Sequence, residues 1–331
     1  MNVVGVDLGG TKVAAARLQD GALADSVILP TQRSSTDVLI DELVEAVEQA
    51  RSGDLEAVGI GVPSVVEFET GRVVSSVNIP LADTPLRHVL GDRLGVPVFV
   101  DNDATVAALA EAHDDQLRLV AGNLVMLTVG TGVGGGLVLG GRIYRGSTGA
   151  AGELGHTIVG APLTESVPKP AEFPQPGSLE ALASGHALDA LGTQLAAAHP
   201  ESELAKQAGA DRRVLGTEVV AAAHAGDQLA LAAIELWARR LGIGIANAIN
   251  AFDPDEVVIG GGGIAAGELL LEPATAVARE YVLPGLGERT TIRLARHGVR
   301  AGVLGAALLA VHELGEAGPP VTAGTPTAAG N

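Results

Sequence analysis

The stretch VGVDLGGTKVAAARL at Val4–Leu18 decides the fold of this 331-residue chain. Two runs of small and β-branched apolar residues flank a turn with two adjacent glycines. This pattern predicts a β-hairpin with strands at Val3–Val6 and Val13–Leu18. Because glycine has no Cβ, the turn can bring backbone N–H groups close to an anion. The hairpin turn therefore predicts a loop that holds phosphate.

Two further glycine-rich loops follow strand-like runs later in the chain. They are TVGTGVGGG at Thr128–Gly136 and VVIGGGG at Val257–Gly263. A fourth segment, VDNDATVAALAEA at Val100–Ala112, places a carboxylate where a helix begins. Three such loops from distant parts of the chain suggest a nucleotide cradled between two halves of the protein. Together with the carboxylate, they suggest phosphoryl transfer.

Two common nucleotide-binding motifs do not explain these loops. Gly130, Gly132 and Gly135 match G-x-G-x-x-G, but that fingerprint requires a helix directly after the loop. Here the next residues, GLVLGGRIY, favour a strand, and the chain contains no G-x-x-x-x-G-K-[ST] motif. Hairpin turns must therefore hold the phosphates.

The composition narrows the classes of partner. The apolar content is 47%, the net charge is −18, and no basic cluster occurs, so we expect a globular protein that binds neither nucleic acid nor an anionic membrane. The absence of cysteine excludes disulfides and thiolate metal sites.

The first residues lack a signal-peptide pattern, so we expect a cytoplasmic protein. The uncharged run Leu124–Gly141 has the length of a membrane span, but its seven glycines favour a buried hairpin.

The remaining elements follow from apolar periodicity and from turn residues. The strand–glycine loop–strand unit occurs twice, which predicts an internal duplication visible as topology. A segment with five prolines at 160–177 predicts a surface loop. We expect further strands at 25–30, 57–62, 71–77, 96–100, 122–129, 134–139, 142–144 and 257–259. We expect helices at 36–51, 85–94, 178–191, 216–225, 227–252 and 302–314.

The motifs together resemble the ROK family, which comprises sugar kinases and related repressors of the actin-like ATPase superfamily. VGVDLGGTKVAAARL is similar to the first phosphate loop of that family, and VDNDATVAALAEA to its catalytic segment. LTVGTGVGGGLVLGGRIYRGSTGAAGELGH resembles the second phosphate loop running into the family's E-x-G-H, and VVIGGGGI resembles the adenosine loop. The resemblance covers about Val3–Leu314.

The resemblance implies an α/β protein with the actin-like ATPase (ribonuclease H-like) fold, in which two lobes flank a central cleft. We expect a small lobe at 1–119, closed by a C-terminal helix at 299–315, a large lobe at 120–298 and a disordered tail at 316–331. The implied activity is phosphorylation of a hexose by ATP with Mg²⁺, with glucose converted to glucose 6-phosphate in a homodimeric enzyme of glycolysis.

Several alternatives stay open at this point. The sugar could be mannose, fructose, N-acetylglucosamine or N-acetylmannosamine, and polyphosphate could replace ATP. A non-catalytic, sugar-responsive regulator is the alternative from a different class. Because the first loop begins at Asp7, we expect no winged-helix domain of the kind that family repressors carry ahead of it.

The resemblance also assigns roles to individual residues. Asp103 matches the general base, and its place near a helix start leads us to expect that it keeps its charge readily. A helix cap is the alternative role for Asp103. Residues that match sugar-binding positions are Asn78, Asn102, Asp103, Glu153, His156 and Glu180. Residues that match the nucleotide site are Asp7, Gly9, Gly10, Thr11, Lys12, Thr131, Gly132, Gly261 and Gly262.

The chain departs from the family pattern in one segment. Family members carry a C-x-C-G-x-x-G-C motif that holds a structural zinc together with the E-x-G-H histidine. Here the interval after His156 reads TIVGAPLTESVPKPAEFPQPGSLE, and Ser178 stands where a family cysteine precedes Leu-Glu. We therefore expect no zinc, which leaves open whether His156 still contacts the sugar.

Overall fold

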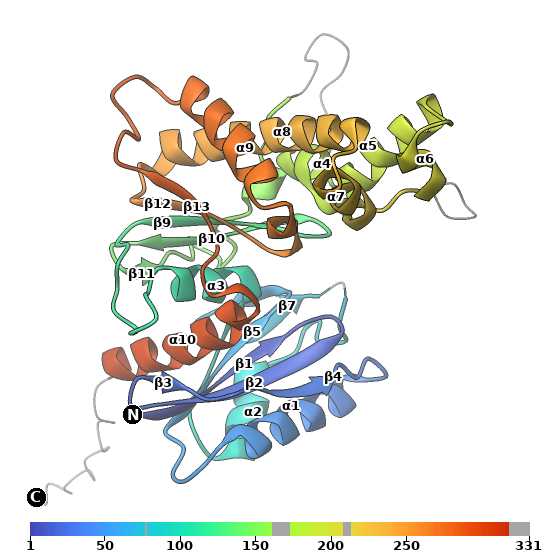
Figure 1. Ribbon diagram of the computed structural model, residues 1–331. Helices are drawn as coiled ribbons and strands as arrows, with labels where there is room; N and C mark the ends of the chain where they lie inside the picture. The colour runs from blue at the N-terminus through green and yellow to red at the C-terminus, as the bar shows by residue number, and fades with distance from the viewer. Residues whose placement is uncertain (77, 161–172, 208–212, 318–331) are drawn as a thin grey trace, which may run out of the picture.

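The computed structural model describes residues 1–76, 78–160, 173–207 and 213–317. Two β-sheets stack with helices below, between and above them, which gives five alternating layers (Figure 1). Residues 161–172 of the predicted surface loop and residues 318–331 of the predicted tail lie outside the described residues. Residues 316 and 317, expected in the tail, instead end the last helix.

The first sheet is built around the predicted hairpin. Strands β1 (Asn2–Leu8) and β2 (Lys12–Gln19) pair antiparallel, and β5 (Ala57–Val62) and β8 (Val98–Asn102) continue the sheet parallel to β1. Two short strands, β3 (Ala22–Leu23) and β4 (Val27–Pro30), both pair with β2. The strand order is β3-β2-β1-β5-β8.

Helices α1 (Thr36–Ala50) and α2 (Leu86–Leu94) cover the outer face of this sheet. Their buried leucines pack against Val4, Val6 and Ile60. A small separate hairpin, β6 (Val65–Glu67) and β7 (Arg72–Ser75), follows β5.

The second sheet repeats the topology of the first. Strands β9 (Leu124–Val129), β10 (Val133–Leu139) and β11 (Arg142–Ile143) pair antiparallel, and β12 (Glu256–Gly260) and β13 (Thr291–Leu294) are parallel to β9. The order β11-β10-β9-β12-β13 matches that of the first sheet, with two parallel strands added beside a three-stranded meander. The duplication predicted from the two glycine hairpins is therefore present as topology.

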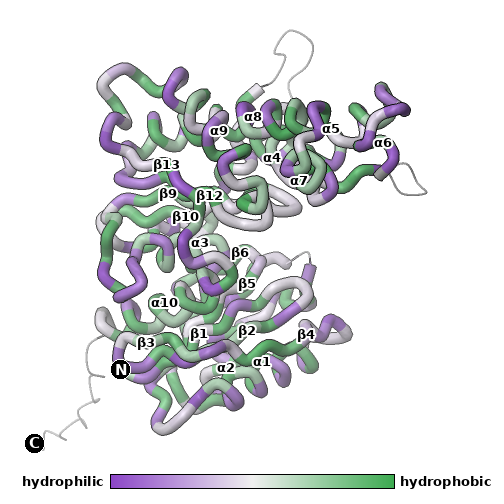
Figure 2. The backbone as a smooth tube through the Cα atoms, viewed as in Figure 1, coloured by the Kyte–Doolittle hydropathy of each residue, from purple (hydrophilic) through white to green (hydrophobic). Residues whose placement is uncertain are grey.

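Two helices fill the layer between the sheets. Helix α10 (Ala301–Ala317) packs on β1 and β5, helix α3 (Asp103–Glu111) packs on β9 and β10, and the two helices contact each other. Both are mostly hydrophobic (Figure 2). The approach is close, because a Cβ on Gly59 would lie 1.8 Å from the carbonyl oxygen of Ala306. Only glycine therefore allows the sheet and α10 to meet here.

Residues 298–315 form the one stretch in the described part of the chain that is long and apolar enough to cross a membrane. Half of this stretch is buried in the layer between the two sheets, where its helix contacts β1, β5 and α3. These contacts account for its hydrophobicity as that of a core helix.

The upper face of the second sheet carries a group of helices around the buried Trp237. The predicted helix at 178–191 is in fact two helices, because the backbone of Ser184 is extended and its hydroxyl caps the second one. The sequence did not predict α6, α9, β3, β6 or β13. The helices of this group are α4 (Leu179–Ala183), α5 (Gly185–Ala198), α6 (Glu203–Gln207), α7 (Gly216–His224), α8 (Gln228–Phe252) and α9 (Glu268–Tyr281).

Candidate active site

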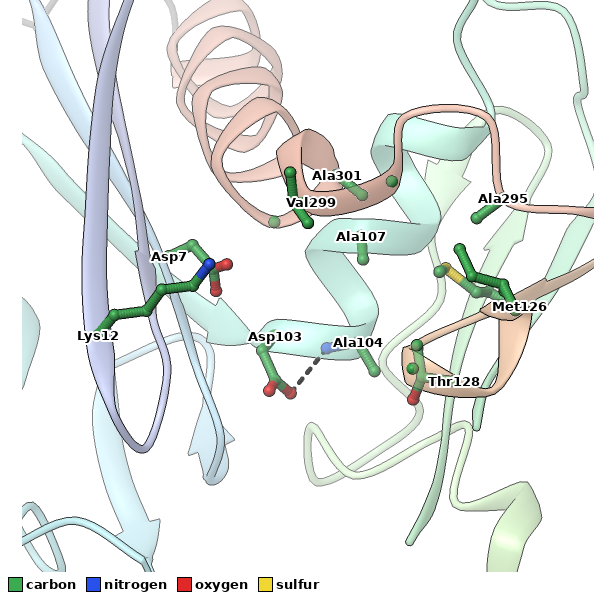
Figure 3. Close-up of a pocket in the computed structure, with 15 residues that line it drawn as sticks. Asp7, Lys12, Asp103, Ala104, Ala107, Met126, Thr128, Ala295, Val299 and Ala301 are labelled. Carbon is green, nitrogen blue, oxygen red and sulfur yellow. Dashed lines mark hydrogen bonds between the residues drawn. The ribbon is translucent and has the colours of Figure 1, made fainter. Parts of the chain in front are cut away.

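A cavity of about 500 Å³ opens between the two sheets, where β1 ends and where α3 and α10 begin (Figure 3). Five residues predicted from the sequence line it together. They are Asp7, Lys12, Asp103, Gly261 and Gly262. They come from segments as far apart as β1 and the end of β12, so the cleft joins the first and third glycine loops to the carboxylate.

Asp103 is the first residue of α3, but Asn102 is its N-cap. The amide oxygen of Asn102 accepts hydrogen bonds from the backbone N–H groups of Ala104 at 2.9 Å and Thr105 at 3.2 Å. The carboxylate of Asp103 shares only the Ala104 N–H, at 2.8 Å, and points into the cleft (Figure 3). Because a neighbour supplies the cap, Asp103 is available for chemistry.

The electrostatics of Asp103 correct the expectation that it keeps its charge readily. The pKa of Asp103 is raised to about 6, mainly by burial, and the nearby carboxylates of Asp7 and Glu153 contribute to this increase. The N–H of Ala104 acts in the opposite direction but is the weaker influence. Desolvation therefore outweighs the favourable helix start, and the carboxylate is a stronger base than an ordinary aspartate.

The capping role limits what Asn102 can offer a ligand. Its amide oxygen is engaged with the start of α3, and its amide nitrogen donates to the carbonyl oxygen of Ser64 at 3.3 Å. The predicted sugar contact of Asn102 stays a prediction, and this geometry leaves it one amide hydrogen to donate.

Asp7 lies at the end of β1, beneath the start of α10. A Cβ on Gly302 would lie 2.4 Å from the carboxyl carbon of Asp7, so the backbone of α10 covers this side chain closely. Burial raises the pKa of Asp7, and the charge of Lys12 lowers it to a smaller extent. A buried carboxylate with so little compensation would be stabilised by a cation in the cleft.

The first glycine loop is a tight turn tied to β4. The N–H of Gly9 donates to the carbonyl oxygen of Lys12 at 2.9 Å. The hydroxyl of Thr31 donates to the carbonyl of Gly9 at 2.7 Å, and the N–H of Thr31 donates to the carbonyl of Thr11 at 3.0 Å. These bonds fix the loop from outside and leave Gly10 and the exposed Thr11 at its tip.

The second glycine loop is held by Glu180. One carboxylate oxygen of Glu180 accepts the N–H of Val133 at 2.8 Å, and a Cβ on Gly132 would lie 2.2 Å from the same oxygen. The N–H of Gly185 donates to the carbonyl of Gly130 at 2.7 Å. Glu180 therefore shapes the second loop with one of its two carboxylate oxygens.

A second cavity of about 510 Å³ adjoins the first at Gly262. Thr131 lies at its edge, and Leu188, Val220 and Trp237 contribute apolar surface to its lining. Gly261, which lines the first cavity beside Gly262, has φ +78°, and a Cβ there would lie 2.5 Å from the carbonyl oxygen of Val129. The size and lining of this cavity suit a flat heteroaromatic ring.

Glu153 and His156 lie in the turn that follows β10 and β11 of the second sheet. Their carboxylate and imidazole are 3.7 Å apart, and the His156 ring meets the edge of Phe173 at 5.4 Å between ring centres. Glu153 is close enough to Asp103 to raise its pKa. Both side chains are more than one third exposed, so they are not part of the core, and neither lines the first or the second cavity.

The described residues do not test the predictions for Asn78 and for zinc. Asn78 is exposed and follows residue 77, which lies outside the described residues. Among the described residues, no group of three or more histidine or acidic side chains converges in a way that could hold a metal. Glu165 and Glu172, two acids of the segment that replaces the cysteine motif, lie outside these residues. The absence of zinc stays a prediction.

The start of α10 is a part of the cleft that was not predicted from the sequence. Val299 is 85% exposed there, and the residues of this segment that line the first cavity are Gly298, Val299, Ala301 and Gly302. The signal in the sequence was the pair of glycines in HGVRAG ahead of a long apolar helix. A glycine at such a position can bring backbone very close to a ligand or to a buried carboxylate.

The chain was compared with known proteins. The sequence model of the ROK family matches residues 3–313. The chain is 37% identical to a glucokinase of Halalkalibacterium halodurans, over 91% of this chain and 92% of that protein. It is similar in structure to a ROK family glucokinase from Streptomyces griseus in complex with glucose and AMPPNP, with a TM-score of 0.76, 32% identity and coverage of 94% and 100%. It is also similar to a ROK hexokinase from Thermus thermophilus, with a TM-score of 0.76, 38% identity and coverage of 96% and 100%.

Proposed function

The chain belongs to the ROK family, and from this premise we propose that its cleft transfers the γ-phosphoryl group of ATP to the C6 hydroxyl of glucose. The chain is an ATP-dependent glucose kinase, a phosphotransferase with an alcohol group as acceptor. Similarity to the ROK glucokinase and hexokinase structures confirms the actin-like ATPase fold with two lobes and a central cleft. We propose lobe boundaries at 1–119 and 120–298, with α10 closing the small lobe.

One observation carries the residue assignment. Asp103 lies in the cleft between the two sheets, is relieved of capping by Asn102 and has a pKa raised to about 6. Such a carboxylate is charged at neutral pH, yet it binds a proton more readily than an ordinary aspartate. A base of this strength suits a reaction in which the proton leaves as the new bond forms.

The reaction follows from this placement. The C6 hydroxyl oxygen of glucose attacks the γ-phosphorus, and a new O–P bond forms while the proton of the hydroxyl passes to Asp103. The bond between the γ-phosphorus and the β,γ-bridging oxygen breaks, and ADP leaves with that electron pair. We propose that five residues form hydrogen bonds with the sugar hydroxyls. They are Asn78, Asn102, Glu153, His156 and Glu180, the last through the carboxylate oxygen that does not bond Val133.

The nucleotide would extend from the first cavity into the second. We propose that the glycine loops hold the phosphates through Gly9, Gly10, Thr11, Lys12, Thr131 and Gly132. Gly261 and Gly262 would lie against the adenosine, whose ring fits the cavity beside Trp237. When bound with ATP, Mg²⁺ neutralises phosphate charge. Asp7 is the residue that fits it, because burial leaves its carboxylate short of positive charge.

The apolar second cavity also bears on the phosphate donor. Polyphosphate has no nucleobase to place in the second cavity, whereas the adenine ring of ATP would remove the apolar surface of that cavity from water. We therefore propose ATP as the donor. We further propose that the enzyme is a cytoplasmic homodimer that needs no zinc and binds no nucleic acid, with its mass in solution as the test of the dimer.

A coupled assay tests the proposal. Glucose, mannose, fructose, N-acetylglucosamine and N-acetylmannosamine would each be offered with Mg²⁺ and either ATP or polyphosphate. We expect the highest kcat/KM with glucose and ATP, and ³¹P NMR should identify glucose 6-phosphate as the product. A higher kcat/KM for an N-acetylhexosamine, or phosphate on another hydroxyl, would contradict the assignment.

A further inference from the structure

Arg145 makes a set of contacts that the proposed chemistry does not use. It follows β11 and reaches from the second sheet to elements of the first. Its Nε donates to a carboxylate oxygen of Asp101 at 2.7 Å, and its Nη2 donates to Glu313 at 3.0 Å. The guanidinium also lies 3.4 Å from the ring centre of Phe68. One side chain thus joins β8, α10 and the segment after β6.

Asp101 connects this contact to the catalytic carboxylate. Its side chain is 2% exposed, and its second oxygen accepts the N–H of Asn102 at 2.9 Å. Asn102 in turn caps α3 and is followed directly by Asp103. The Asp101 carboxylate therefore orients the backbone from which Asp103 projects, and Arg145 is its ion-pair partner.

The backbone of Arg145 begins a loop that leads to Glu153. The carbonyl oxygen of Arg145 accepts the N–H of Ala151 at 3.1 Å, which closes the loop between Arg145 and Ala151. Within this loop Gly149 has φ +86°, and a Cβ there would lie 2.2 Å from the carbonyl oxygen of Val66. The loop therefore packs against β6 of the small lobe, and Glu153 follows two residues after its end.

We propose that Arg145 is a positioning residue that fixes Glu153 relative to Asp103, and so couples sugar binding to alignment of the reacting hydroxyl. This inference rests on the roles proposed above for these two carboxylates. Arg145 touches neither cavity lined by the nucleotide loops. Arg145 therefore affects the positions of Glu153 and Asp103 on the sugar side of the cleft and leaves the nucleotide site unchanged.

The shape of the guanidinium explains why arginine suits this position. Its Nε and Nη2 donate to two different carboxylates, while its face stacks on Phe68. A lysine ammonium supplies one point charge and has no planar face. Lysine should therefore keep the ion pair with the buried Asp101 but hold the loop less firmly.

The test compares Arg145→Met, Arg145→Lys and Asp101→Asn with Arg118→Met. Arg118 forms a similar pair with Asp114, but its side chain is 70% exposed and the pair lies outside both cavities. Glucose kinetics would be measured at saturating ATP. ATP affinity would be followed by the fluorescence of Trp237, the only tryptophan in the chain, which lines the second cavity.

We expect Arg145→Met to lower kcat/KM for glucose by roughly 10- to 100-fold, because small misplacements of reacting groups have effects of this size. ATP affinity should stay within about twofold, as for sites that do not interact. Asp101→Asn should have a similar effect, and the double variant should be no worse than the more damaging single one. Arg145→Lys should fall between the parent and Arg145→Met, and Arg118→Met should match the parent.

Three results would overturn the inference. They are an unchanged kcat/KM in Arg145→Met, a parallel loss of ATP and glucose binding with a lower Tm, and fully additive effects in the double variant. If Arg145→Met does not fold, the kcat/KM and ATP affinity of Arg145→Lys and Asp101→Asn decide the matter in the same way. A parent enzyme that leaves glucose unphosphorylated in this assay would refute the proposed function instead.

Discussion

Replacing Asp103 with asparagine should strongly lower turnover and stabilise the fold. The asparagine keeps the shape of the side chain and can still accept the N–H of Ala104, but it cannot take a proton from the sugar hydroxyl. We expect kcat to fall by roughly 10²-fold or more, the usual contribution of a general base, while glucose affinity changes much less. Coupled kinetics and calorimetric glucose titration measure the two effects.

The expected gain in stability follows from the pKa of Asp103, which is about 6 against an ordinary 3.8. Each pKa unit corresponds to about 1.4 kcal/mol, so the charged carboxylate destabilises the folded chain by at most about 3 kcal/mol at pH 8. Asparagine removes the charge and should recover that amount.

The sign of the pH dependence follows from the raised pKa. The folded chain binds the Asp103 proton more tightly than the unfolded chain, so the penalty is full above about pH 6 and disappears as pH falls towards 4. The stability difference between Asp103→Asn and the parent should therefore roughly halve between pH 8 and pH 5. Asp25→Asn, at an exposed aspartate, is the matched control. Near-normal turnover, or a variant less stable than the parent at pH 8, would refute the reasoning.

Three further outcomes follow from the cleft. The kcat/KM for glucose should fall on the acid side with an apparent pKa near 6, and a flat profile down to pH 5 would exclude Asp103 as the titrating base. Saturating glucose should reduce the radius of gyration in small-angle scattering and slow hydrogen exchange around Pro63 and Asn78, whereas no change in either would count against lobe closure. EDTA should abolish activity, and Mg²⁺ alone should restore it at unchanged Tm. About one equivalent of tightly bound zinc per chain would show that the missing cysteine motif has been replaced by other ligands.

Local sequence signals predicted most of the two sheets. Glycine turns flanked by β-branched runs identified both hairpins, and the strand at Ala57–Val62 has the predicted bounds. The signals failed where tertiary contacts decide the outcome. Ser184 and Gly185 sit inside an unbroken helical pattern, and the split between α4 and α5 arises because the N–H of Gly185 bonds the carbonyl of Gly130 in a distant loop. No local pattern could reveal that bond.

The same distinction applies to the candidate site. The residue types in VDNDAT indicated an acid at a helix start, and the structure brings it into one cleft with Asp7 and Lys12. Which residue caps the helix depends on backbone angles that the sequence does not show. The contribution of α10 to the cleft also depends on its packing against α3 and β1, which lie about 200 and about 300 residues earlier in the chain.

The pKa of Asp103 shows why sequence position alone misjudges a catalytic group. A helix start favours a charged aspartate by a few tenths of a kcal/mol to about 1 kcal/mol, and that influence was the one visible in the sequence. Asn102 accepts the N–H groups of Ala104 and Thr105, so Asp103 receives little of that benefit. Burial in the cleft raises the pKa of Asp103, the N–H of Ala104 lowers it to a smaller extent, and the carboxylates of Asp7 and Glu153 add to the increase. Asn102 and Asp103 therefore have different roles. Asn102 caps and stabilises α3, whereas Asp103 does not cap the helix and keeps a high affinity for a proton.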